Sequence, residues 1–123
     1  MSFSPDLQLP LLAIERRAEL SQVPHPDGSL YSVLLARIQA AWPGRWQEVQ
    51  SALSGGQWER VAALTHALVG TTASLGLARL SGCLRVLEHA ARQADAESAG
   101  QCAAVVANLY AQTIEACLGT SGD

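Results

Sequence analysis

The chain has 123 residues, of which 49% are hydrophobic and 15% are charged, and its formal net charge is −3 at pH 7. This length suits a single domain, and the hydrophobic content is too high for a chain that stays disordered. The acidic balance argues against a nucleic-acid partner, and the low aromatic content of 5% favours helices over sheets.

Several other classes of protein are disfavoured by what the sequence lacks. No apolar run approaches the roughly 18 residues of a membrane-spanning helix, and the N-terminus lacks the pattern of a secretory signal, so no direct membrane contact is expected. The cysteines Cys83, Cys102 and Cys117 form no C-x-x-C motif, which indicates buried thiols in a reducing cytoplasm. The histidines have no i, i+4 spacing, so no metal site is expected.

The N-terminal part predicts one short helix followed by a loop. Residues 1–9 mix polar and apolar side chains, and Pro10 suits the first turn of a helix that runs to about Ser21. Its apolar side would hold Leu11, Leu12, Ile14 and Ala18. Residues 23–29 contain two prolines and a glycine, which predicts a loop.

A long helical pattern follows from about Ser29 to Leu53, and the glycines at 55–56 end it. Pro43-Gly44 lies inside this pattern, and we expect it to kink the helix or to split it. The predicted inward stripe comprises Leu30, Leu34, Ile38, Ala41, Val49 and Leu53, with Trp42 and Trp46 adjacent.

Three further helices complete the predicted fold. The first covers 57–75, a turn at Gly76 leads into the second at 77–92, and a polar gap at 95–100 precedes the last. The last helix would face inward with Cys102, Val105, Val106, Leu109, Thr113 and Ala116. The prediction is an all-α, antiparallel up-and-down four-helix bundle with a short N-terminal capping helix. It forms one domain over 1–123, with a core at about 28–118 and flexible ends at 1–9 and 119–123.

His66 is the most informative residue of the chain. The apolar stripe of its helix runs through Val61, Leu64, Leu68, Thr72 and Leu75. At about 100° per residue, His66 lies roughly 165° from the centre of that stripe and points away from the core. Its neighbours on the helix surface are the small residues Ala62, Ala63, Gly70 and Ala73. Another protein can therefore reach this imidazole.

The turn at Gly76 brings a second helix alongside His66. In an antiparallel pair, residues equally distant from the turn lie side by side, which places Arg85 and Glu88 on the flank nearest the histidine, with Arg92 one turn further on. Glu88 is placed to hold the Nδ1 proton and leave Nε2 free as a nucleophile. Arg85 is placed to pair with an anion on that nitrogen.

The central run resembles the signature of histidine-containing phosphotransfer (HPt) domains of bacterial two-component phosphorelays. The resemblance covers about residues 30–118, and its upstream part includes an aromatic-Pro pair and the VxxALxGGxW connection at residues 49–58. The matching positions of the central run are His66, Gly70, Leu75, Gly76, Leu80, Leu87 and Glu88.

The resemblance implies that His66 accepts a phosphoryl group from an aspartate of one receiver domain and passes it to another. The partners would be receiver domains of response regulators and of a hybrid histidine kinase. The receiver would supply Mg²⁺, so the chain itself needs no cofactor, and it would be a phosphocarrier rather than an enzyme. The chain is expected to act as a monomer, either free-standing or as the C-terminal domain of a hybrid kinase.

One position departs from the family pattern. HPt domains usually carry lysine three residues after the histidine, and this chain has Val69. One hypothesis is that Arg85 partly replaces that lysine. Another is that Val69 enlarges an apolar docking patch formed with Ala62, Ala63, Gly70 and Ala73, and that the receiver supplies all of the charge. The alternative function is an HPt-like scaffold that binds a receiver or another signalling partner with weak or no transfer.

Overall fold

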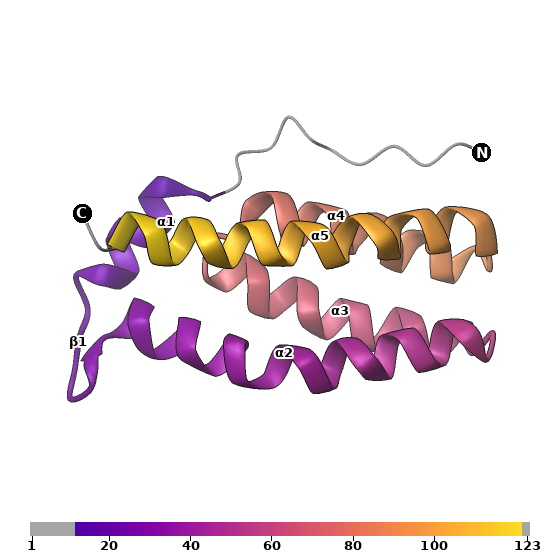
Figure 1. Cartoon of the computed structure of the whole chain (residues 1–123), viewed down its shortest axis with the longest axis horizontal. Helices are drawn as coiled ribbons and strands as arrows, with labels where there is room; N and C mark the ends of the chain where they lie inside the picture. Colours follow the sequence, from indigo (N-terminus) through magenta and orange to yellow (C-terminus); the bar gives the residue numbers. More distant parts are fainter. Residues whose placement is uncertain (1–11, 122–123) are drawn as a thin grey trace.

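The computed structural model describes residues 12–121, and the described chain is a bundle of helices (Figure 1). Consecutive long helices pack antiparallel, and a short helix lies at one end. The predicted all-α bundle with an N-terminal helix is therefore confirmed. The elements are α1 (Ile14–Ser21), β1 (Pro24–His25), β2 (Gly28–Ser29), α2 (Leu30–Ser54), α3 (Trp58–Ser74), α4 (Ala78–Arg92) and α5 (Ala96–Ser121).

The short helix α1 is held against the turn between α3 and α4. The backbone N–H of Ala13 donates to the Gly76 carbonyl at 2.6 Å, and Arg16 Nε donates to the Ser74 carbonyl at 2.9 Å. Because Ala13 is extended and bonds to this turn, the helix begins at Ile14 rather than at Pro10 as predicted. Leu20 of α1 is buried in the core.

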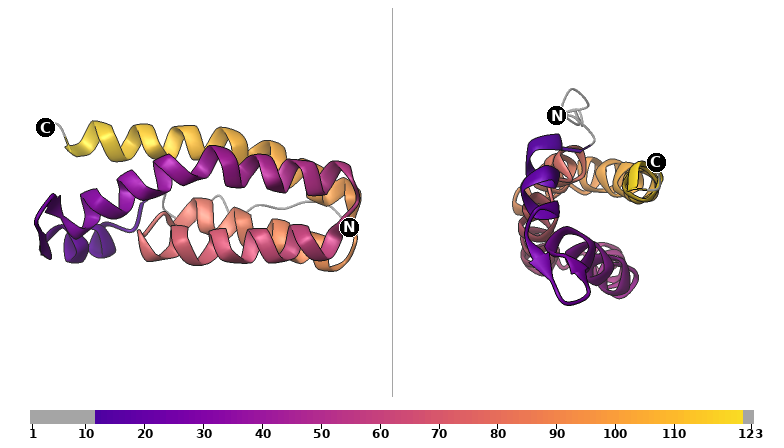
Figure 2. Two further views of the ribbon diagram at one scale, coloured as in Figure 1. Left: turned by 90° about the horizontal axis from the view of Figure 1, so that it is seen from below. Right: turned by 90° about the vertical axis from the view of Figure 1, so that its left-hand side faces the viewer.

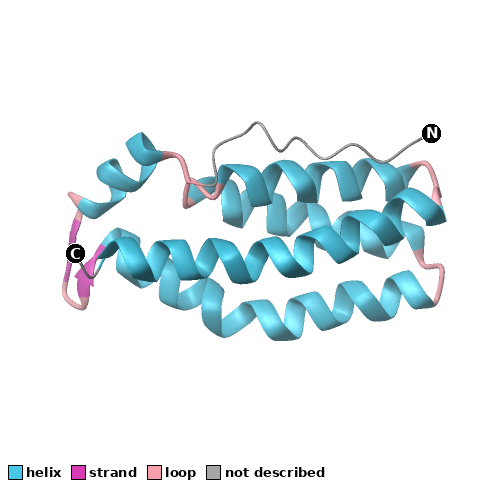
Figure 3. Cartoon of the chain, turned by 45° about the horizontal axis from the view of Figure 1, so that its top comes forward, coloured by secondary structure: helices cyan, strands magenta, loops and turns pink. Residues whose placement is uncertain are grey.

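The predicted inward side of α1 needs correction. Ala18 is exposed, and Leu11 lies outside the described residues. The loop predicted at 23–29 contains the antiparallel pair β1–β2, which connects α1 to α2 at the end of the bundle where α5 finishes (Figure 3).

Helix α2 runs without a break through Pro43, so of the two predicted outcomes, a kink or a split, the split is wrong. Pro43 and Gly44 are both exposed, which places the interruption of the hydrogen-bond ladder on the solvent side. The helix bows along its length instead (Figure 2). At its start, Ser29 and Ser32 exchange side-chain and backbone hydrogen bonds in a capping box.

The core between α2 and α5 is aromatic. Trp42 stacks on Tyr110 with ring centroids 4.1 Å apart and on Trp46 with centroids 5.5 Å apart. The buried stripe of α2 therefore turns toward the tryptophans, and the predicted inward residue Ala41 is exposed. The buried residues of α2 are Tyr31, Leu35, Ile38, Trp42, Trp46, Val49 and Ala52.

Helix α4 supplies the aliphatic centre of the bundle, with Leu80, Leu84 and Leu87 fully buried. After it, the polar segment predicted as a gap at 95–100 is mostly helical. Asp95 accepts a hydrogen bond from the Ser98 backbone N–H at 3.1 Å, which caps α5 and lets it begin at Ala96.

The inward face of α5 differs slightly from the prediction. Cys102, Val106, Leu109 and Thr113 are buried as expected. Val105 and Ala116, also predicted to face inward, are only half-buried, and Cys117 is buried instead. The helix continues to Ser121. Of the ends predicted to be flexible, at 1–9 and 119–123, residues 1–9 and 122–123 lie outside the described residues, and α5 includes residues 119–121.

Candidate functional site

Helix α3 presents His66 to solvent. The side chain is 73% exposed, because the residues that anchor α3 lie on its other faces. These anchors include the predicted stripe residues Val61, Leu68 and Thr72. Buried Thr65, next to the histidine, donates its hydroxyl to the Val61 carbonyl at 2.7 Å and so needs no outside partner.

Helix α4 brings a carboxylate to the histidine. The chain reverses at Gly76, whose φ of +74° suits glycine, and α3 and α4 then lie side by side. Glu88 Oε2 is 3.1 Å from His66 Nδ1, and Oε1 is 3.3 Å from the same nitrogen. The Glu88 side chain is only 14% exposed, so the packing of α4 fixes its position.

Arg92 holds the other side of the same carboxylate. Its Nη2 is 2.6 Å and its Nε is 3.2 Å from Glu88 Oε2. Burial raises the pKa of Glu88, but the hydrogen bonds from Arg92 and His66 together outweigh burial and bring that pKa below the ordinary value of 4.5. Glu88 is therefore ionised at neutral pH.

The ionised carboxylate determines which nitrogen of His66 carries the proton. A carboxylate without a proton only accepts hydrogen bonds, so Nδ1 of a neutral imidazole is the donor. Nε2 then carries the lone pair, and it belongs to a largely exposed ring. The arrangement is a nucleophilic nitrogen on an exposed ring that is held in one tautomer.

The small residues around His66 divide into two groups. Ala63 and Gly70 are exposed and Ala73 is half-buried, whereas Ala62 and Val69 are buried. A Cβ added at Gly70 would meet nothing within 4 Å. The surface beside the imidazole is therefore open at Gly70, while Ala62 and Val69 contribute mainly to packing.

The two arginines near the site differ in their contacts. Arg85 is exposed, and within the described part of the chain no hydrogen bond or ion pair joins it to His66 or Glu88. The contact between Arg92 and Glu88 was not predicted. The i, i+4 spacing of the two residues is the signal that indicates it.

The remaining histidines and cysteines are not part of this site. His25 Nδ1 accepts the Asp27 backbone N–H at 3.1 Å in the β1–β2 turn. The three cysteines are buried, and burial raises the pKa of Cys102 to about 12. In the described chain, no group of three or more His, Cys, Asp or Glu residues is placed to hold a metal ion. None of the described helices has the length and apolar character that crossing a membrane requires.

The fold and the site define a class: a helical bundle that offers one oriented histidine on its surface. The family model of the Hpt domain matches residues 33–116, and the chain belongs to this family. No curated protein and no solved structure matches it. The expected family resemblance is thus confirmed. An Hpt domain is a phosphocarrier with a histidine phosphotransfer role in a phosphorelay, and no kinase domain was found in the chain.

Proposed function

We propose that His66 is the phosphoacceptor and that it relays a phosphoryl group between the receiver domains of two signalling proteins. The observation that carries the proposal is the contact between His66 Nδ1 and the ionised Glu88, which leaves Nε2 as the exposed nucleophile. Membership of the Hpt family supports the same assignment.

The transfer step follows from this geometry. The Nε2 lone pair of His66 attacks the phosphorus of a receiver aspartyl phosphate, and the bond from phosphorus to the aspartate oxygen breaks. The electron pair of that bond remains on the departing carboxylate. The imidazole keeps its Nδ1 proton and gains positive charge, which Glu88 stabilises across 3.1 Å. Attack by an aspartate of a second receiver reverses these steps.

The partner would dock on the open face of α3. Ala63, Gly70 and Ala73 allow a close approach to the imidazole, and the buried Ala62 and Val69 support the helix beneath that face. The receiver supplies Mg²⁺ and the acidic pocket in this proposal. The chain acts as a monomer in the cytoplasm, where its donor would be a hybrid histidine kinase.

In this proposal, a positive charge from Arg92 or Arg85 balances the negative charge of the phosphoryl group. Arg92 is tied to Glu88 and lies in the same cluster, and Arg85 is exposed on the same helix. We expect Arg92→Ala to slow transfer more than Arg85→Ala, because only Arg92 has a contact that orients it. Equal rates for wild type and both variants would exclude a role for either guanidinium.

Val69 favours a second candidate function. Its side chain is 9% exposed and packs in the core, so no cation extends from the position where the family usually has lysine. A domain of this kind would bind a receiver as a scaffold and transfer little or no phosphoryl group.

The experiment that separates the two functions is labelling by receivers. Purified receiver domains carrying labelled aspartyl phosphate are mixed with the chain, and stable transfer is scored as acid-labile, base-stable label. The phosphocarrier proposal predicts label on wild type and none on His66→Gln. His25→Gln is the matched control, and it should label like wild type. Binding without label on wild type would support the scaffold function instead.

A further inference from the structure

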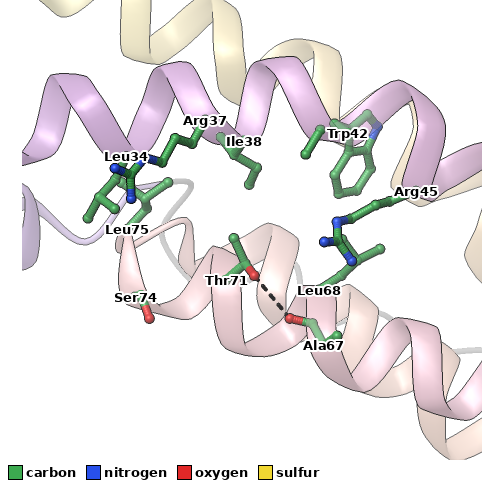
Figure 4. Close-up of a pocket in the computed structure, with 11 residues that line it drawn as sticks. Leu34, Arg37, Ile38, Trp42, Arg45, Ala67, Leu68, Thr71, Ser74 and Leu75 are labelled. Carbon is green, nitrogen blue, oxygen red and sulfur yellow. Dashed lines mark hydrogen bonds between the residues drawn. The ribbon is translucent and has the colours of Figure 1, made fainter.

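A cleft separates α2 from α3 on the side of α3 away from Glu88, and it encloses about 430 Å³ (Figure 4). Apolar side chains form its floor: Leu68 and Leu75 from α3, and Ile38 and Trp42 from α2. All four are at least nine-tenths buried. The cleft is therefore a firm apolar groove whose shape is set by the core.

The wall that α2 contributes is positively charged. Arg37 and Arg45 line the cleft, and Figure 4 shows them toward its two ends with Ile38 between them. Both are exposed, and within residues 12–121 no ion pair engages either guanidinium. No carboxylate from the described residues lines the cleft, although the chain as a whole carries a net charge of −3. The groove therefore complements an acidic partner.

The wall that α3 contributes has small side chains whose hydroxyls are hydrogen-bonded within α3 itself. The Thr71 hydroxyl donates to the Ala67 carbonyl at 3.1 Å, and the Ser74 hydroxyl donates to the Gly70 carbonyl at 2.9 Å. Because these hydroxyls already have hydrogen-bond acceptors, the arginines of α2 are the groups that can recognise a charged partner. Ala67, which lines the cleft, directly follows His66 in the sequence. An element seated in the cleft would lie beside the imidazole.

We propose that the cleft selects the receiver partner by seating an amphipathic helix whose apolar stripe is flanked by carboxylates. The inference rests on the proposed function, because it names the chemistry of the partner that reaches His66. Arg37 and Arg45 are eight positions apart on one helix, which is about 12 Å along the axis. Two acidic residues about two turns apart on the partner helix would match them. The apolar stripe between these acids would cover Leu34 and Ala41, which line the cleft and are half-buried and exposed, respectively.

Charge reversal in the cleft tests the inference. The receiver that labels or binds wild type best is titrated against wild type, the double variant Arg37→Glu/Arg45→Glu, and Arg60→Glu. Arg60 is exposed, lies outside the cleft and pairs with Glu48, so Arg60→Glu controls for charge reversal away from the cleft, at half the change in net charge. Circular dichroism and urea unfolding verify that each variant is folded.

The cleft variant is expected to bind at least about tenfold more weakly, because like charges then face each other across the interface. Arg60→Glu is expected to change binding by less than about threefold. Wild-type affinity should fall with added salt more steeply than that of the cleft variant. An acid-to-arginine scan of the receiver's exposed helices should yield a change that restores binding to the cleft variant.

Three results would overturn the inference. The first is equal weakening by the cleft and Arg60 variants, and the second is a wild-type chain that binds no receiver. The third is self-association of wild type that the cleft variant abolishes, since a second copy would then occupy the groove. Failure of the proposed function is distinguishable: the receiver would bind in a cleft-dependent way while His66 remained unlabelled.

Discussion

Replacing Glu88 by glutamine isolates the effect of its charge on His66. The side chain keeps its size, and its amide oxygen can still accept from Nδ1 across the present 3.1 Å. The amide nitrogen can also donate, so a flipped glutamine would stabilise the opposite tautomer. The substitution therefore removes the feature that makes Nε2 the nucleophile while leaving the helices in place.

The size of the effect follows from the kind of hydrogen bond that is lost. A hydrogen bond to a charged group contributes roughly 1.5–3 kcal/mol, and a neutral one contributes roughly 0.5–1.5 kcal/mol. The difference of about 1 kcal/mol corresponds to a change of about fivefold in the ratio of the two tautomers. Unfolding free energy should change by less than about 1 kcal/mol, because His66 is 73% and Arg92 is 58% exposed.

The assay is nitrogen-15 NMR of the imidazole, in which the chemical shifts of Nδ1 and Nε2 report the tautomer directly. Wild type should show the Nδ1–H form, and Glu88→Gln should lower the ratio of Nδ1–H to Nε2–H about fivefold. Phosphotransfer should slow in the same variant. An unchanged tautomer ratio would refute the reasoning that Glu88 orients His66.

Three further predictions concern the frame of the site. Gly76→Ala should destabilise the fold by about 1–2 kcal/mol from the left-handed backbone alone, and more because its Cβ would lie 2.9 Å from Arg16 Cβ; urea unfolding measures this, and unchanged stability would contradict it. Trp42→Ala should cost about 3–5 kcal/mol, since Trp42 is buried in the aromatic stack; a loss below about 1 kcal/mol would show that the stack contributes little. Gly70→Ala and Gly44→Ala each place a methyl group in open space within a helix. Each should raise the free energy of unfolding by about 0.5–1 kcal/mol. Only Gly70→Ala should slow transfer, because only Gly70 lies on the proposed docking face; equal transfer by both variants would count against that face.

The ionisation of Glu88 also predicts a dependence of stability on pH. Its pKa is lower in the folded protein than the ordinary value of 4.5, so the unfolded chain binds the proton more tightly. The contribution of Glu88 to stability is therefore present above the ordinary pKa and is lost as the pH falls through the folded pKa. The stability difference between wild type and Glu88→Gln should be largest near neutral pH and shrink in acid. Urea unfolding at several pH values measures it, and a difference that grows in acid would contradict the sign.

The sequence predicts those parts of the fold that depend on helical periodicity. The stripe of α4 and the turn at Gly76 follow from leucine spacing and one glycine, and the geometry that brings Glu88 to His66 follows from them. Pro43 shows where local rules fall short. Its backbone cost is fixed by the residue type, but whether the helix survives depends on the exposure of that segment and on tertiary packing.

Two features of the site depend on side-chain placement that periodicity does not determine. Arg85 and Arg92 lie on the same side of α4, one turn before and one turn after Glu88. Helical spacing allows either arginine to reach Glu88, and the structure shows that Arg92 does so. The cleft cannot be predicted from the residue pattern of one helix, because its walls come from two helices, α2 and α3. The shift of the α2 stripe toward Trp42 arises from stacking on Tyr110 of α5, a contact between residues distant in the sequence.

The most direct test of the account is to identify which nitrogen of His66 carries the phosphoryl group. After transfer from a receiver, nitrogen-15 and phosphorus-31 NMR of the selectively labelled protein locate the phosphorus. Because Glu88 holds Nδ1 at 3.1 Å, the account predicts phosphorylation of Nε2 with the proton retained on Nδ1. Phosphorus on Nδ1, or on a residue other than His66, would contradict it.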